Sequence, residues 1–346
     1  MSKSHYTAYI ITATALLTLV LFVVNLFVGS VDIPFCDTLK VLTGGDAEKM
    51  SHSYIIINSR VPAAVTSLLC GASLAVSGLM LQTAFSNPLA GPSILGISSG
   101  ANLGVALVIL AGGTGFLPSL FDSASSLSSL PVIAAAFVGA MAVMAVILLL
   151  STVIRSNMML LIVGIMLGYI TSSAISLLNF FSTEEGVHSF VIWGMGNFNG
   201  VSLQQLPLFS LSCGLGLLLS VLLIKPLNAL LLGTQYAENL GINIRRTRNM
   251  LLFATGLLTA VTTAYCGPVA FIGLAVPHVA RMLLGSDNHQ QLLPLTILCG
   301  SVTALACNLI TTLPGDSGII PLNAITPLLG APVIIYVILS KRIRHT

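Results

Sequence analysis

Long apolar stretches with very few charges constrain this chain more than any other feature of its sequence. A helix needs about 20 apolar residues to cross a bilayer, where every backbone polar group must be bonded internally. Of the 346 residues, 55% are hydrophobic and 7% are charged, against about a quarter charged in soluble domains. The predicted fold is an all-α polytopic membrane protein. Its ten candidate spans are 8–29, 62–84, 92–112, 131–153, 158–181, 204–224, 250–267, 271–284, 291–311 and 323–340.

The distribution of basic residues predicts the orientation, because Lys and Arg are enriched in cytoplasmic loops. With ten spans, both termini lie on one side, and the basic tail at residues 341–344 favours the cytoplasm. Ten basic residues then fall inside: Lys3, Arg155, Lys225, Arg245, Arg246, Arg248, Arg281, Lys341, Arg342 and Arg344. Three fall outside: Lys40, Lys49 and Arg60. The first span exceeds the roughly 7–15-residue core of a secretory signal, so we expect it to be retained as an anchor.

The stretches between spans are too short to fold as separate soluble domains. The longest, near 30–60, 112–130 and 225–249, have about 30 residues at most. We therefore expect one transmembrane domain over 1–346, with any ATP hydrolysis supplied by a partner. The six cysteines show no CxxC spacing, which predicts small buried residues and neither a metal site nor a disulfide framework. No cofactor and no nucleic-acid partner are expected.

Two segments interrupt the apolar pattern with Gly, Pro and polar residues. In 87–100, Pro88 and Pro92 stop a continuous helix, which favours a re-entrant turn that orders the bundle. In 233–248, a polar run ends a predicted short helix at Gly241 and places three arginines beside the next span. From the residues alone, this second segment is either an ordinary basic loop or a docking surface for a cytosolic partner.

A third segment, 267–281, is punctuated by Gly and Pro and ends in His278 and Arg281. Both lie near the inner end of a predicted span, where an Arg side chain can reach the headgroups. Ion-driven carriers usually keep ionisable residues inside their spans, and here those positions are almost empty. A structural or gate-supporting role is favoured for His278 and Arg281 over ion coupling.

The order of these motifs along nearly the whole chain resembles the FecCD permease family, the membrane subunits of importers for iron-siderophore complexes, haem and vitamin B12. The resemblance rests on Arg60-Val61-Pro62, 71–78, Gln82, Asn87-Pro88-Leu89-Ala90, 95–100 with Gly96, 271–274 with Gly273, Pro277-His278, Arg281, Leu293-Pro294 and 329–332. It implies a structural role for Asn87, Pro88, Gly96, Gly273, Pro277, His278 and Arg281.

The same resemblance implies an assembly in the inner membrane of two copies of the chain, a cytoplasmic ABC ATPase dimer and a periplasmic or lipid-anchored substrate-binding protein, in contact with membrane lipid. The 226–249 segment would then be the coupling loop on the ATPase. Its expected contacts are Tyr236, Glu238, Leu240, Gly241, Arg245 and Arg246.

Resemblance also implies an outer gate helix at about 184–196 and a pathway lined by the fifth span. The expected pathway or gate residues are Met159, Met166, Ser172, Ser176, Asn179 and Trp193. Such a wall offers weak contacts suited to a bulky cargo. The competing interpretation for the Ser side chains is that they merely join helices, whereas Trp193 is compatible with both a gate and an interfacial anchor.

Binding-protein docking is implied for Arg60, but the chain departs from the family at two other positions. Ala63 and Thr312 stand where outer arginines are common in the family. The predicted function is the permease subunit of an ATP-driven importer, itself not an enzyme. The alternatives are an ion-coupled secondary transporter, which should retain an intramembrane acid, and an integral-membrane enzyme, which should gather His or carboxylates at one depth.

Overall fold

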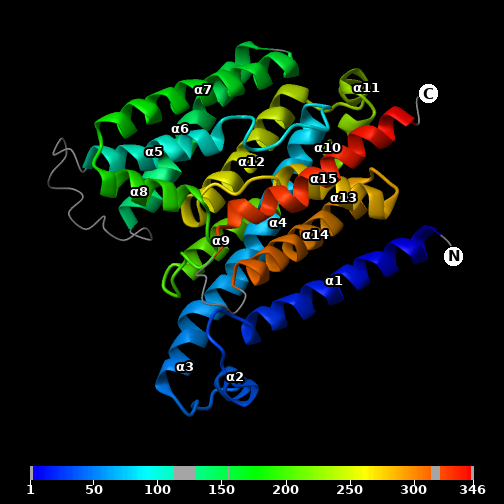
Figure 1. Cartoon of the computed structure of the whole chain (residues 1–346). Coiled ribbons are helices and arrows are strands. Elements are labelled where there is room, and N and C mark those ends of the chain that lie inside the picture. Colours follow the sequence, from blue (N-terminus) through cyan, green and yellow to red (C-terminus); the bar gives the residue numbers. More distant parts are fainter. Residues whose placement is uncertain (1–2, 113–129, 155, 313–319, 344–346) are drawn as a thin grey trace.

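The computed structural model describes residues 3–112, 130–154, 156–312 and 320–343, and these contain helices but no strand (Figure 1). The helices are α1 (Lys3–Phe27), α2 (Phe35–Leu42), α3 (Met50–Ile55), η1 (Ile56–Arg60), α4 (Val61–Ala84), α5 (Ile97–Gly112), α6 (Leu130–Val153), α7 (Asn157–Phe181), α8 (Glu184–Gly194), α9 (Leu206–Leu222), α10 (Ile224–Leu231), α11 (Thr234–Asn239), α12 (Ile244–Cys266), α13 (Ile272–Leu284), α14 (His289–Thr311) and α15 (Leu322–Ile343). Arg155 and Arg344, which are predicted to lie on the cytoplasmic side, are outside the described residues.

Apolar helices occupy all ten predicted span positions. Six are long and apolar enough to cross a membrane by themselves: those ending at Phe27, Ala84, Val153, Phe181, Cys266 and Thr311. The pair α9 and α10 passes the same test together but is bent by 49°. The remaining three, within α5, α13 and α15, are apolar but have 10–17 residues. The all-α polytopic fold is confirmed, and the number of crossings remains a prediction.

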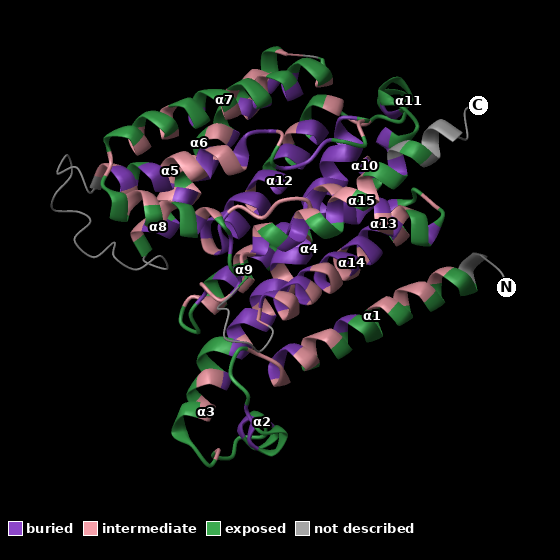
Figure 2. Cartoon of the chain, in the orientation of Figure 1, coloured by how far each residue is buried: buried purple, intermediate pink, exposed green. Residues whose placement is uncertain are grey.

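Helix α4 forms the centre of the bundle because small residues let its neighbours approach closely. It packs against α14, α12, α13 and α9, and almost all of its residues are buried, as Figure 2 shows. A Cβ placed on Gly71 would lie 2.2 Å from the Gly300 carbonyl oxygen of α14, and one on Gly78 would lie 1.5 Å from the Gly273 carbonyl oxygen of α13. Such small-residue crossings are the usual means of helix association in lipid.

The two ends of the bundle carry different segments. In Figure 1 the start of α1, the end of α15 and α11 lie towards one end, while α2, α3 and α8 lie towards the other. Between α1 and α4, the helices α2 and α3 fold over a small cluster of Ile33, Val41 and Ile56. A 2.7 Å hydrogen bond between Asp37 Oδ2 and His52 Nδ1 joins α2 to α3. This arrangement agrees with the predicted topology, in which 30–60 is outside and 225–249 is inside.

Candidate functional site

The predicted coupling segment folds into α10, α11 and the first turns of α12. Gly233 at φ 101° and Gly241 at φ 82° provide the left-handed backbone that lets α11 project as a separate short helix. Ala237 is fully buried, and its carbonyl accepts a 3.1 Å hydrogen bond from the Ile242 N–H. With one face fixed in this way, α11 turns its other side chains outward.

The side chains expected to contact a partner are on that outward surface. Tyr236 is 52% exposed, Leu240 is 57% exposed and Glu238 is also exposed. A surface that combines an aromatic, an aliphatic and an acidic residue can bury apolar area and form an ion pair with a complementary protein. The helix ending predicted at Gly241 is confirmed, since α11 ends at Asn239.

The three arginines of 245–248 do not form one surface. Helix α12 begins at Ile244, earlier than the predicted span at 250, so they lie in its first turns. Arg245 and Arg246 are exposed. Arg248 is 9% exposed and donates hydrogen bonds to the carbonyls of Ser151 and Ile154 at the end of α6. Arg248 therefore holds α12 to α6, and only Arg245 and Arg246, the two arginines expected to contact the ATPase, are available to a partner.

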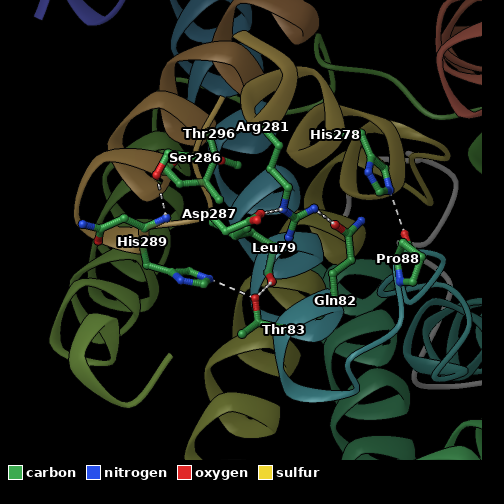
Figure 3. A network of polar contacts seen from close by, with 12 residues as sticks. Leu79, Gln82, Thr83, Pro88, His278, Arg281, Ser286, Asp287, His289 and Thr296 are labelled. Carbon is green, nitrogen blue, oxygen red and sulfur yellow. Dashed lines mark hydrogen bonds and ion pairs between the residues drawn. The ribbon is translucent and has the colours of Figure 1, made fainter. Parts of the chain in front are cut away.

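A polar network at the same end of the bundle connects α4, α13 and α14 (Figure 3). Arg281 donates to Gln82 Oε1 and forms a 3.3 Å ion pair with Asp287. Gln82 Nε2 in turn donates to the Leu274 carbonyl of α13 over 3.1 Å. Arg281 is therefore occupied by two partners from other segments, as expected of a structural residue.

The 85–96 segment contacts the bundle at Pro88 and Gly96 and contains a local turn at Asn87. His278 Nε2 lies 2.7 Å from the Pro88 carbonyl oxygen, and the side chain of Asn87 accepts a 2.9 Å bond from the Leu89 N–H in a local turn. Gly96 has φ 75°, and a Cβ there would lie 2.9 Å from the Gly164 carbonyl of α7. The Asn87 side chain thus shapes the turn, and Gly96 allows the close approach to α7.

A cavity of about 780 Å³ opens beside this network. Its walls come from the end of α4, the 85–88 turn, α10, α13 and α15, and include Gln82, Asn87, His278, Arg281 and Tyr336. The cavity is at the end of the bundle that carries α11.

Helix α7 leaves much of its surface exposed, as α1 also does. It packs on α5 and α6, while Met159 is 62% exposed and Met166 is 48% exposed. Ser172 and Ser176 are exposed on the same helix. Asn179 Oδ1 is buried and has no hydrogen-bond partner among the described residues. The exposed surface of α7 thus combines apolar Met side chains with polar Ser side chains among the predicted pathway residues.

Helix α8 follows α7 and includes the predicted gate region. Thr183 caps its N-terminus, and Trp193 near its end is 7% exposed and stacks with Phe190 at a ring distance of 6.5 Å. Trp193 is therefore packed inside the bundle, and its gate and anchor roles remain predictions. The predicted helix at 184–196 is confirmed, as α8 ends at Gly194.

Asn323, which sequence reasoning missed, joins three separate segments. Its side-chain nitrogen donates to the carbonyls of Gly194 and Pro268, at 3.0 and 2.6 Å, and its side-chain oxygen accepts from the Ala270 N–H at 3.1 Å. Asn323 therefore connects the end of α8, the break between α12 and α13, and the start of α15. The sequence did contain one indication of this role, because Asn323 is a single polar amide side chain at the start of an apolar span, directly after Pro321-Leu322.

The break between α12 and α13 is conformationally strained. Gly267 has φ 73° and Phe271 has φ 66°, an uncommon value for a residue with a side chain. Strain of this kind persists only when its surroundings enforce it. Here Asn323 bonds both Pro268 and Ala270 within the break.

Arg60 is buried and its guanidinium is used inside the protein. It is 6% exposed and donates to the carbonyls of Leu26, Phe27 and Val31, so it caps the carboxyl end of α1. The docking role predicted for Arg60 has no support in this geometry. Among the residues that the structure describes, no group of three His, Cys, Asp or Glu side chains could hold a metal ion.

The helical bundle, with a buried small-residue centre, an uncovered α7 and a projecting α11, defines a polytopic transport subunit. The sequence model of the FecCD transport family matches residues 17–340. The chain belongs to this family. It is 36% identical over 283 residues to the vitamin B12 import system permease protein BtuC of Vibrio cholerae, covering 82% of each chain. It is also 36% identical over 311 residues to the Salmonella arizonae BtuC, covering 88% of this chain and 89% of that protein.

A solved structure, described as a metal-chelate-type ABC transporter in an inward-facing conformation, matches with a TM-score of 0.82 and 30% identity. It covers 96% of this chain and 99% of that chain. The chain is thus a multi-pass permease subunit of an ABC importer in the inner membrane, not an enzyme and not an ion-coupled carrier. Such a permease works with an ATPase and a substrate-binding protein.

Proposed function

We propose that two copies of the chain pair so that their α7 helices face each other across the pathway for the cargo. The observation that carries this proposal is the mixed surface of α7. Ser172 and Ser176 are exposed on the helix that also exposes Met159 and Met166, and the Ser176 hydroxyl donates a 3.0 Å bond to the Ser172 carbonyl. Polar side chains of this kind are enriched where membrane helices meet each other, which supports a partner on this surface. A second copy would cover this face and leave a water-accessible channel between the two chains.

The proposed cargo is a bulky metal chelate of the corrinoid class, with ferric siderophores and haem as the related candidates. The relatives from Vibrio cholerae and Salmonella arizonae support the corrinoid, because both are vitamin B12 import permeases. The wall itself supports a large, partly apolar cargo, because Met166, Tyr169 and Ile170 are flexible or apolar and exposed. Weak contacts of this kind let a cargo pass without being trapped.

In the proposed mechanism, ATP-driven closure of the ATPase dimer pushes on α11. Because Ala237 is buried, α11 and α10 transmit the push as a body, and α10 reaches α14 through a 3.0 Å bond between Asn228 and Asn288. The network of Gln82 and Arg281 then carries the displacement to α4 and α13. At the other end, α8 acts as the outer gate.

Uptake by proteoliposomes tests this function. Vesicles with the chain, its ATPase and its binding protein receive labelled cobalamin, a ferric siderophore or haem, with and without internal ATP. Accumulation of cobalamin only with ATP supports the proposal. ATP-dependent uptake of one of the other cargoes would reject the corrinoid assignment and retain the importer.

Cross-linking tests the pairing through α7 separately. In a Cys36→Ser background, Met166→Cys should give a cross-linked dimer with a short bifunctional maleimide. Leu149→Cys on α6, 69% exposed but away from α7, is the matched control and should give none. Cross-linking at Leu149→Cys without any at Met166→Cys would refute pairing through α7.

A further inference from the structure

A second cavity of about 1060 Å³ forms an apolar groove along the outside of α12. Helices α6 and α9 both pack against α12, and their last turns form the walls of the groove. Its apolar lining consists of Ala145, Leu148, Leu149, Leu219, Leu222, Leu223, Met250 and Phe253. Leu149 and Leu222 are 69% and 68% exposed, so the groove is open along its length.

Two cations lie at one end of this groove. Arg245 and Arg246 line it together with Asn243, and both arginines are exposed. Among the described residues, neither guanidinium forms an ion pair, whereas the nearby Arg248 is turned inward to the carbonyls of α6. The charged end adjoins the segment that carries α11, which is the cytoplasmic end in the predicted topology.

We propose that this groove binds an anionic phospholipid of the inner leaflet, with its phosphate on Arg245 and Arg246 and an acyl chain along α12. An apolar channel that ends in two uncompensated cations is complementary to an amphiphile with a negative head. Basic pockets between membrane helices on the cytoplasmic side bind such headgroups. A contact with the ATPase would use the arginines but would not require an open apolar groove behind them.

The groove is large enough for this occupant. Pockets for ligands of drug size measure roughly 300–1,000 Å³, and the groove, at about 1060 Å³, is slightly larger. An acyl chain in the bilayer is already surrounded by hydrocarbon, so the apolar wall contributes by van der Waals packing against the chain and not by transfer from water. A soluble phosphate would lack that contribution, which separates a lipid from a free anion.

Native mass spectrometry of the full chain, released from nanodiscs of equal parts phosphatidylglycerol and phosphatidylethanolamine, tests the proposal. The chain should retain phosphatidylglycerol in preference to phosphatidylethanolamine. Removing each arginine, as Arg245→Gln and Arg246→Gln, should reduce that preference roughly fivefold, and the double variant should abolish it. Lys225→Gln removes an exposed cation from the same end, outside the groove, and should leave the preference unchanged.

A second pair of variants tests the apolar part without changing charge. Ala145→Phe fills the groove and should lower retention of phosphatidylglycerol, while Ala142→Phe, exposed on the same helix outside the groove, should not. Addition of inorganic phosphate should displace no lipid. Equal retention in wild type and the double arginine variant would overturn the proposal. So would loss of ATPase co-purification in that variant with lipid retention intact, because this would assign the arginines to the partner.

Discussion

Replacing Asn323 by Leu should loosen the junction of α8, α15 and the 267–271 break. The substitution removes three side-chain hydrogen bonds, to Gly194, Pro268 and Ala270. Measured hydrogen bonds between membrane helices average about 0.6 kcal/mol, so three of them amount to roughly 2 kcal/mol. Because Leu has a similar volume, packing changes should add little.

The sole tryptophan provides a local readout. Trp193 precedes Gly194, whose carbonyl accepts from Asn323, so its fluorescence should report the junction during SDS titration of the protein in mixed micelles. Circular dichroism of the same samples reports the whole bundle. We expect the fluorescence transition of Asn323→Leu to shift to lower SDS by an amount equivalent to roughly 2 kcal/mol.

Two further variants make the test specific. Asn323→Asp keeps an acceptor for Ala270 but places carboxylate oxygens against the carbonyls of Gly194 and Pro268, so it should be less stable than Asn323→Leu. Asn58→Leu removes one exposed 3.3 Å bond and should change the free energy of unfolding by less than about 0.5 kcal/mol. If Asn323→Leu is no less stable than Asn58→Leu, the connecting role of Asn323 is refuted.

Three other predictions concern α11 and the region around α2. Glu238→Lys should lower ATPase co-purification without changing thermal stability, because the side chain is exposed; unchanged capture would argue against coupling through this residue. Arg60→Gln should destabilise the protein by about 2 kcal/mol in SDS titration, since it uncaps α1, and should leave binding-protein capture intact; the reverse pattern would restore the docking role. The hydrogen bond from His52 lowers the pKa of Asp37 in the folded protein below its ordinary 3.8. The stability that this hydrogen bond contributes is therefore present above pH 3.8 and is lost as the pH falls through the lower pKa of the folded state. The melting-temperature difference between wild type and Asp37→Asn should accordingly shrink below about pH 4, and a constant difference would contradict this.

The predicted coupling segment shows which features can be predicted from the sequence and which cannot. Gly241 and the polar run predicted a short helix on the cytoplasmic side, because glycine and helix-ending signals act within a few residues. Arg246 is exposed and Arg248 is buried, and this difference could not be predicted because both belong to the same short basic run. The difference depends on which side of α12 meets α6, and that is fixed only when the two helices pack.

Arg60 illustrates the same limit at the other end of the bundle. Its motif supported the family assignment, but its partners are carbonyls about 30 residues away at the end of α1, as the sequence separations of 34, 33 and 29 show. A family-based docking role therefore could not be distinguished from a structural one. Asn323 was missed for the same reason, since its partners are 53 to 129 residues distant.

The sequence by itself determined the membrane class, the helical fold, the positions of the apolar helices and the family, because hydropathy, helix-breaking residues and motif order are local properties of the chain. Only the tertiary structure decided which polar side chains are buried in networks and which remain uncovered. Burial and hydrogen bonding depend on how helices far apart in the sequence pack together, and small residues such as Gly71 and Gly300 set that packing by allowing two backbones to touch.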